Sequence, residues 1–183
     1  LITVSGLKPG SEMTLTDLRA MTGKITDHYR KNGYFLAQVY LPAQDIKDGI
    51  VTLEVVIGRY GAISINNQTH LTDAVANNLL SGLASGDAIE SEPLETRLLL
   101  LSDIAGVNVS STLLPGAALG SSDLKIELTP GPRLTGMIDA DNAGLPFTGK
   151  YRLGGTVNIN NLAGLGDVAS LRVLSSGNGM TYG

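Results

Sequence analysis

The sequence has no cysteine and no tryptophan, and only two of its 183 residues are phenylalanine. Without cysteine, disulfide bonds and thiolate metal sites are excluded. No apolar stretch approaches the roughly 20 residues of a membrane-spanning helix, and the longest apolar helical run covers only residues 98–101. The net charge of −4 argues against nucleic acid as the main partner, because phosphate binding needs a basic patch.

Glycine and hydrophobic residues are plentiful. With 23 glycines and 43% hydrophobic residues, the chain can bury a core, and the mixture favours strands with tight turns over a helical bundle. The sequence starts with Leu1 rather than methionine and stops within a strand-like pattern at Gly183. We therefore expect a piece of a longer protein, so the lack of a targeting signal says nothing about location.

Residues 1–58 predict a strand, a helix and two further strands. The helix is expected over residues 14–33, where Gly33 stops it and Leu18, Met21, Ile25 and Tyr29 recur at helical spacing. Strands are expected at 34–41 and 50–58, separated by a polar turn.

Residues 59–132 repeat this architecture. A strand at 60–67 precedes two helices, which start after the possible caps Thr72 and Ser91. Strands at 107–116 and 122–131 follow, around a Gly/Ser turn. Each unit is predicted to be a small α+β module with its helices packed on one face of a three-stranded sheet.

After Pro132 the pattern changes to period two, which predicts three strands at 133–141, 150–161 and 167–176. Alternating segments of about ten residues with turns between them are typical of outer-membrane strands. In that case the apolar face meets lipid and the polar face meets the lumen; in a soluble sheet the apolar face would cover a core. The residues predicted to face the lumen are Asp139, Asp141, Arg152, Asn158 and Arg172.

Two further expectations concern these strands. Arg152 can pair with Asp139 or Asp141 on the neighbouring strand, which would help to set the register. Three strands cannot close a barrel, and open edges are not tolerated in lipid, so we expect their edges to pair with other strands.

The motifs of the chain resemble a family, the outer-membrane transporters of two-partner secretion (TpsB, the haemolysin-activator/haemagglutinin-transporter family). Residues 15–59 are similar to the end of the first POTRA domain of such a transporter, and residues 59–131 are similar to the second. The first-domain motifs are Tyr29, Gly33-Tyr34, Leu41-Pro42-Ala43-Gln44, Asp48-Gly49 and Gly58. The motifs that resemble the start of the barrel are Asp141-Asn142-Ala143-Gly144, Thr148-Gly149-Lys150-Tyr151-Arg152 and Asn161-Leu162-Ala163-Gly164-Leu165-Gly166-Asp167.

The resemblance implies α+β POTRA modules of strand–helix–helix–strand–strand order, followed by the first antiparallel strands of a transmembrane β-barrel. The expected domains are an N-terminally truncated first POTRA at 1–58, a second POTRA at 59–132 and the truncated start of the barrel at 133–183. The implied location is the bacterial outer membrane, with the POTRA domains in the periplasm. There they would dock a secreted exoprotein, an adhesin or cytolysin with a TpsA-type secretion domain, and the pore would export it.

A three-stranded POTRA sheet leaves an open edge, normally at its second strand, that can receive an extended client strand. In the first module the candidate edge residues are Gln38 and Tyr40. The second module offers the better candidate because the strand is polar and Ser-rich. Its residues are Val107, Val109, Ser111 and Leu113.

Other functions remain open at this point. A barrel-assembly factor has similar modules, and a soluble β-rich binding module would bury every sheet. An enzyme is the least supported class, because no nucleophile, base or metal cluster is evident and the two histidines, His28 and His70, have no partnering residues nearby in the sequence. We therefore predict no catalytic residues, no metal, no cofactor, no nucleotide and no nucleic-acid partner; outer-membrane lipid is the second expected partner.

Overall fold

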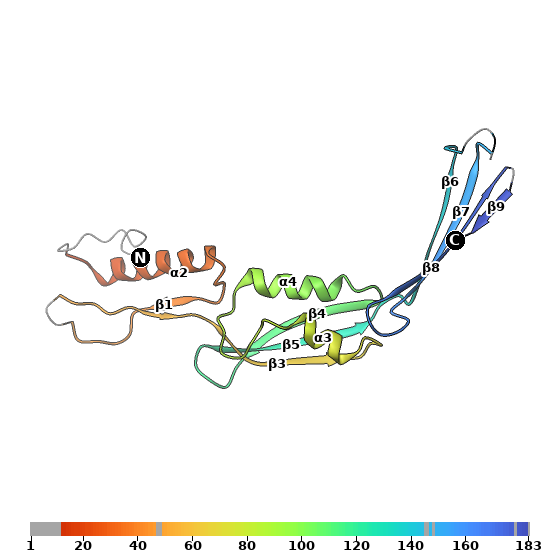
Figure 1. Cartoon of the computed structure of the whole chain (residues 1–183). Helices are drawn as coiled ribbons and strands as arrows, with labels where there is room; N and C mark the ends of the chain where they lie inside the picture. The colour runs from red at the N-terminus through yellow and green to blue at the C-terminus, as the bar shows by residue number, and fades with distance from the viewer. Residues whose placement is uncertain (1–11, 47–48, 145–146, 148, 178, 183) are drawn as a thin grey trace. The chain divides into compact units, whose positions relative to one another are not determined.

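The computed structural model describes residues 12–46, 49–144, 147, 149–177 and 179–182 (Figure 1). The strand expected before the first helix falls in residues 1–11, and Asp48 and Thr148 of the motifs are also outside the described residues. The chain divides into two compact units. The first contains the chain up to Ser64 with Gly82–Arg97 and Thr112–Lys125; the second contains Ile65–Ser81, Leu98–Ser111 and Ile126–Gly183.

The first described element is helix α2, Leu15–Lys31, as the hydrophobic spacing predicted. Thr14 begins it with a capping box, in which the Thr14 hydroxyl accepts a hydrogen bond from the Asp17 N–H and the Asp17 carboxylate accepts one from the Thr14 N–H. The helix ends before Gly33, whose φ of 95° is readily adopted only by glycine. Among the described helices, none is both long and apolar enough to cross a membrane.

Strands β1, Gln38–Tyr40, and β2, Glu54–Val56, pair antiparallel with Val39 opposite Val55. Strand β1 starts later than predicted because residues 34–37 form a turn, in which the Ala37 N–H donates to the Tyr34 carbonyl at 2.9 Å. Strand β2 starts later than predicted because Pro42, which would lie opposite Thr52, has no N–H with which to extend the ladder. The core of this module joins the apolar face of α2 to β1 and the strand beside it. Its buried residues are Leu18, Met21, Ile25 and Val39, with Tyr29, Leu41, Val51, Leu53 and Val55 packed against them.

The next three strands form one sheet in the order β3-β5-β4. Their bounds are β3 Arg59–Asn67, β4 Val107–Pro115 and β5 Ser121–Pro130. Helices α3, Asp73–Leu79, and α4, Ser91–Ser102, come between β3 and β4 in the chain, which gives the predicted strand–helix–helix–strand–strand order. The most deeply buried large side chains of this module are Ile89, Leu101, Leu124, Ile126 and Leu128.

The two predicted helix caps differ from expectation. Thr72 is the N-cap residue of α3, but its side chain makes no capping hydrogen bond. Ser91 is the first residue of α4 rather than the residue before it, and its hydroxyl donates instead to the Gly33 carbonyl at 3.0 Å. A small polar residue therefore identified both helix starts correctly, although neither side chain caps its helix as predicted.

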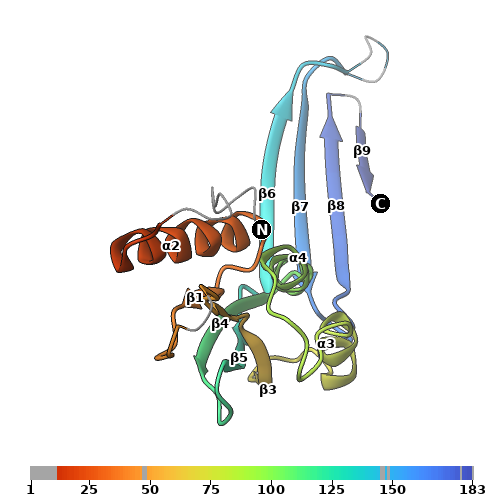
Figure 2. The same cartoon turned by 90° about the vertical axis from the view of Figure 1, so that its left-hand side faces the viewer.

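The last strands form a four-stranded antiparallel sheet in the order β6-β7-β8-β9 (Figure 2). Strands β6, Leu134–Asp141, β7, Arg152–Asn160, and β8, Val168–Ser176, confirm the three predicted strands. The fourth strand, β9, Gly179–Tyr182, was not predicted, because four residues after a glycine-rich turn are too few to show alternation. It pairs with β8, so that β8 has neighbours on both sides.

Candidate functional site

Strand β4 lies at an edge of its sheet, with β5 as its neighbour. Two main-chain hydrogen bonds set its register: the Gly131 N–H donates to the Gly106 carbonyl, and the Gly116 N–H donates to the Ser121 carbonyl. The two bonds agree, because β4 advances from Gly106 to Gly116 by the same number of residues as β5 goes back from Gly131 to Ser121. In an antiparallel pair alternate residues direct both main-chain groups at the partner strand. Even-numbered residues of β4 therefore bond to β5, and odd-numbered residues direct N–H and C=O at the open edge, where the Val107 N–H donates to the Ile104 carbonyl at 3.2 Å.

The four candidate residues of this strand, Val107, Val109, Ser111 and Leu113, are the odd-numbered ones. Their side chains differ, however: Val107 is buried at 6% exposure, Val109 and Leu113 are half-buried, and Ser111 is exposed. The Val107 side chain thus lies in the core, and contact of this residue with a client stays a prediction. An added strand would meet Val107 at its carbonyl group, because its side chain belongs to the core and its N–H donates to the Ile104 carbonyl at 3.2 Å.

In the first module, β1 is paired with β2 alone within the described part of the chain. Gln38 is exposed, and Tyr40 is half-buried opposite Glu54. A hydrogen bond to Glu54, together with burial and the charge of that carboxylate, raises the pKa of the Tyr40 hydroxyl. Both residues line a groove of about 390 Å³ in the first unit, together with Val56 and Leu119. This edge is shorter than that of β4 and offers fewer main-chain groups.

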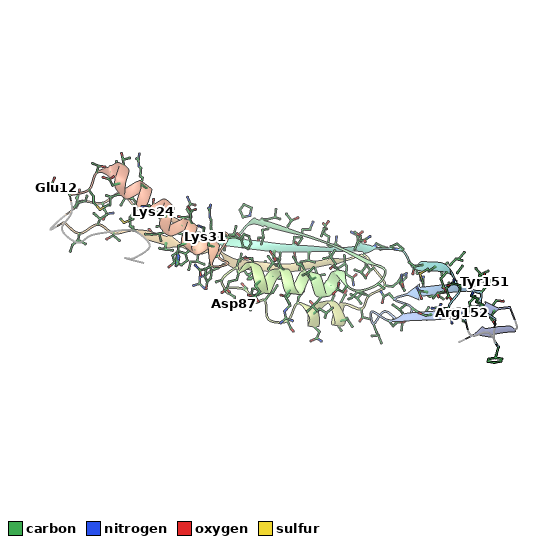
Figure 3. The ribbon with its side chains drawn as sticks, turned by 90° about the horizontal axis from the view of Figure 1, so that it is seen from above. Glu12, Lys24, Lys31, Asp87, Tyr151 and Arg152 are labelled. Carbon is green, nitrogen blue, oxygen red and sulfur yellow. The ribbon has the colours of Figure 1, made fainter. Side chains whose placement is uncertain are left out.

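Two ion pairs lie on the polar face of the β6–β9 sheet. Asp141 is directly opposite Arg152, and the Arg152 Nε lies 2.8 Å from the Asp141 Oδ1, as the sequence suggested. The Arg172 Nη2 reaches the Asp139 Oδ2 at 2.9 Å. The Asp139 carboxylate lies over Gly154, where an added Cβ would meet it at 2.6 Å, so glycine leaves the room for this second pair. Arg152, the first residue of β7, and Tyr151, the residue before it, are labelled in Figure 3.

The opposite face of this sheet is apolar and exposed. Ile138, Leu153 and Leu171 are 83%, 58% and 59% exposed, although each lies in a paired strand. Side chains of this size are normally buried in a sheet that covers a core. Asn160, which alternation placed on the polar face, is instead buried, and its Nδ2 donates to the Pro132 carbonyl at 2.8 Å.

Residues 161–167 form the turn between β7 and β8. Asn161 is buried and has a φ of 52°, and the Thr72 N–H donates to the Gly164 carbonyl at 2.9 Å. The Asn-Leu-x-Gly-x-Gly-Asp motif could have indicated this structured turn, because asparagine and glycine are the residues that adopt left-handed backbone conformations. Among the described residues no group of three or more His, Cys, Asp or Glu side chains could hold a metal ion.

These features define a class: an outer-membrane barrel protein with POTRA modules. Two family models match this chain. Residues 6–58 match the ShlB-type POTRA domain, and residues 120–179 match the haemolysin secretion/activation protein ShlB/FhaC/HecB family.

Similar proteins agree with this assignment. The heme/hemopexin transporter protein HuxB of Haemophilus influenzae (strain 86-028NP) is 33% identical over 91% of this chain and 30% of its own length. The outer membrane transporter CdiB of Dickeya dadantii is 26% identical over 84% of this chain and 27% of its own length. The structure of CdiB from Escherichia coli has a TM-score of 0.72 at 25% identity, covering 90% of this chain and 30% of that one.

The chain thus belongs to the ShlB/FhaC/HecB family, the outer-membrane transporters of two-partner secretion. It spans about 30% of the length of the relatives that it matches. The N-terminal domain of Omp85 from Thermosynechococcus elongatus shares the fold of the modules, with a TM-score of 0.60 at 24% identity. The location that follows is the bacterial outer membrane, with the POTRA modules on its periplasmic side.

Proposed function

We propose that the POTRA modules of this chain dock a secreted exoprotein through its TpsA-type secretion domain and deliver it to the outer-membrane pore that the β6–β9 sheet begins. The observation that carries the proposal is the open edge of β4, where the odd-numbered residues after Val107 direct main-chain groups that bond to no other described strand. An extended client segment can add to such an edge as a further strand. The main chain would supply the affinity, and the exposed side chains beside it would supply the selectivity.

The domain assignment is part of this proposal. Residues up to 58 form the first POTRA module, residues 59–132 form the second, and residues from 133 onward begin the barrel. Lipid is the partner of the exposed apolar face, and the polar face with its two ion pairs lines the lumen. The charged and polar residues assigned to the lumen are Asp139, Asp141, Arg152, Asn158 and Arg172.

Competing functions have less support. A soluble binding module would bury the apolar face of the β6–β9 sheet, yet Ile138 and Leu153 are exposed. A barrel-assembly role draws support only from the shared module fold, whereas the family match favours secretion. We propose neither an enzymatic role nor a nucleotide or nucleic-acid partner, in keeping with transport by the related proteins.

The test uses proline, which removes one main-chain N–H. Ser111→Pro removes an N–H directed at the open edge, whereas Ser110→Pro in the same strand removes one that bonds to β5. The probe is a purified TpsA-type secretion domain, titrated against this chain in detergent micelles. We expect Ser111→Pro to weaken binding about tenfold or more with an unchanged circular dichroism spectrum, and Ser110→Pro to destabilise the module by about 1–3 kcal/mol. Unchanged binding by folded Ser111→Pro protein would refute strand addition at β4.

A further inference from the structure

The turn of residues 161–167 between β7 and β8 is stabilised by its own polar groups. The Asn161 N–H donates to the Asp167 carbonyl, and the Asn161 Oδ1 accepts from the Gly166 N–H at 3.1 Å. The Asp167 carboxylate accepts hydrogen bonds from the N–H groups of Ala163 at 3.0 Å and Leu165 at 3.3 Å. These bonds are internal to the turn and stabilise its shape.

One main-chain group of this turn bonds elsewhere. The Gly164 carbonyl accepts a hydrogen bond from the N–H of Thr72, the residue before α3, at 2.9 Å. The approach is close, because a Cβ added at Gly164 would lie 2.6 Å from the His70 carbonyl oxygen. Gly164 also has a φ of 78°, so both its conformation and its surroundings require glycine.

Two other contacts support this one. A Cβ at Gly166 would meet the side chain of Ile104 at 3.5 Å, an ordinary van der Waals distance. At the end of β7, a Cβ at Gly106 would lie 3.1 Å from the Cβ of Asn160. Asn160 also holds the connection into β6, because its N–H and Nδ2 donate to the carbonyls of Arg133 and Pro132. All of these residues belong to the second compact unit.

We propose that the turn of residues 161–167 is a structural joint that fixes the end of the second POTRA module against the β6–β9 sheet. The peptide connection at Pro132 is one point of attachment and would by itself leave rotation free. The bond between Gly164 and Thr72 is a second point, distant from the first in sequence, and together with the contacts at Gly106 and Gly166 it restricts that rotation. Because β4 starts at Val107, directly after Gly106, the joint would hold the start of its open edge in a fixed position. This inference concerns geometry alone and does not depend on client binding.

The first test compares two alanine variants of the same turn. Gly164→Ala and Gly166→Ala carry similar backbone strain, since both glycines have φ near 80°. Only at Gly164 does the added methyl group meet a main-chain oxygen. Hydrogen exchange at the Thr72 amide, measured on this chain in detergent micelles, should become about tenfold faster in Gly164→Ala and change little in Gly166→Ala.

The second test removes the Thr72 N–H, the donor of the hydrogen bond to Gly164, and leaves the sequence of the turn unchanged. Thr72 has a φ of −68°, which proline adopts without strain, and its side chain makes no capping hydrogen bond, so Thr72→Pro deletes this N–H without removing a cap from the helix. The chain has no cysteine, so spin labels on Asn77→Cys and Ser170→Cys are the only two labels. Their distance distribution should broaden in Thr72→Pro and in Gly164→Ala and stay narrow in Gly166→Ala. A distance distribution as narrow in Thr72→Pro as in the parent protein would refute the proposed joint, even if β4 still binds its client.

Discussion

The Leu41-Pro42-Ala43-Gln44 motif leads to a sharp prediction about the first module. If the pairing of β1 with β2 continued beyond Tyr40, Pro42 would lie opposite Thr52. Proline has no N–H to donate, and the side chain of Gln44 takes its place. The Gln44 Oε1 accepts from the Thr52 N–H at 2.7 Å, and the Gln44 Nε2 donates to the Thr52 carbonyl at 2.7 Å. The amide thus replaces the pairing that proline prevents.

The loss of stability expected when Gln44 is replaced follows from these two hydrogen bonds. Each hydrogen bond contributes a net of about 0.5–1.5 kcal/mol, and partial exposure of Gln44 lets water replace some of that when the side chain is removed. We expect Gln44→Ala to lower the local stability of this strand pair by about 1–2 kcal/mol, which is a factor of about 5–30 in its opening equilibrium. Gln44→Glu keeps one acceptor but places a second oxygen against the Thr52 carbonyl, and should lose a similar amount.

Hydrogen exchange at the Thr52 amide measures this opening directly. In Gln44→Ala the Thr52 amide should exchange about 5–30 times faster than in the parent chain. Gln68→Ala, at another exposed glutamine, is the control and should leave Thr52 unchanged. If Thr52 exchanged at the parental rate in Gln44→Ala, the amide would not be supporting the strand pair, and the structural explanation of the motif would be wrong.

Two further predictions concern the β6–β9 sheet and its turn. Reversing the charge of either Asp141 or Arg152 should slow assembly of the sheet into lipid vesicles. Exchanging the two residues, Asp141→Arg with Arg152→Asp, should restore the rate of assembly. A double variant that assembles no faster than the single variants would exclude their pairing as a register device. Hydrogen bonds from the Ala163 and Leu165 N–H groups lower the pKa of Asp167. The stabilisation by Asp167 is therefore complete above the ordinary aspartate pKa of about 3.9 and is lost as the pH falls through the lower folded value. Thr72 exchange, corrected for the intrinsic pH dependence, should accelerate below about pH 4 in the parent chain and show no such step in Asp167→Asn.

Much of the fold was predictable because local patterns and tertiary packing agree. The spacing of Leu18, Met21 and Ile25 predicted α2, and those residues are buried in its module. Strict alternation predicted β6, β7 and β8 because one face of each strand meets a different environment from the other. The length of β1 was overestimated because its apolar run includes residues 34–37, which form a turn. The length of β2 was overestimated because the composition of this strand does not show that the residue opposite Thr52 is a proline without an N–H.

The candidate site was only partly predictable, and the reason is the same at each residue. The sequence by itself determined the modules, the two-faced strands and the polar character of β4, because these depend on composition and period. Only the tertiary structure decided that Val107 is a core residue, that Arg152 pairs with Asp141 rather than with Asp139, and that Gly164 meets Thr72. Those outcomes depend on register and on contacts between segments far apart in the chain, and a local pattern carries no information about either.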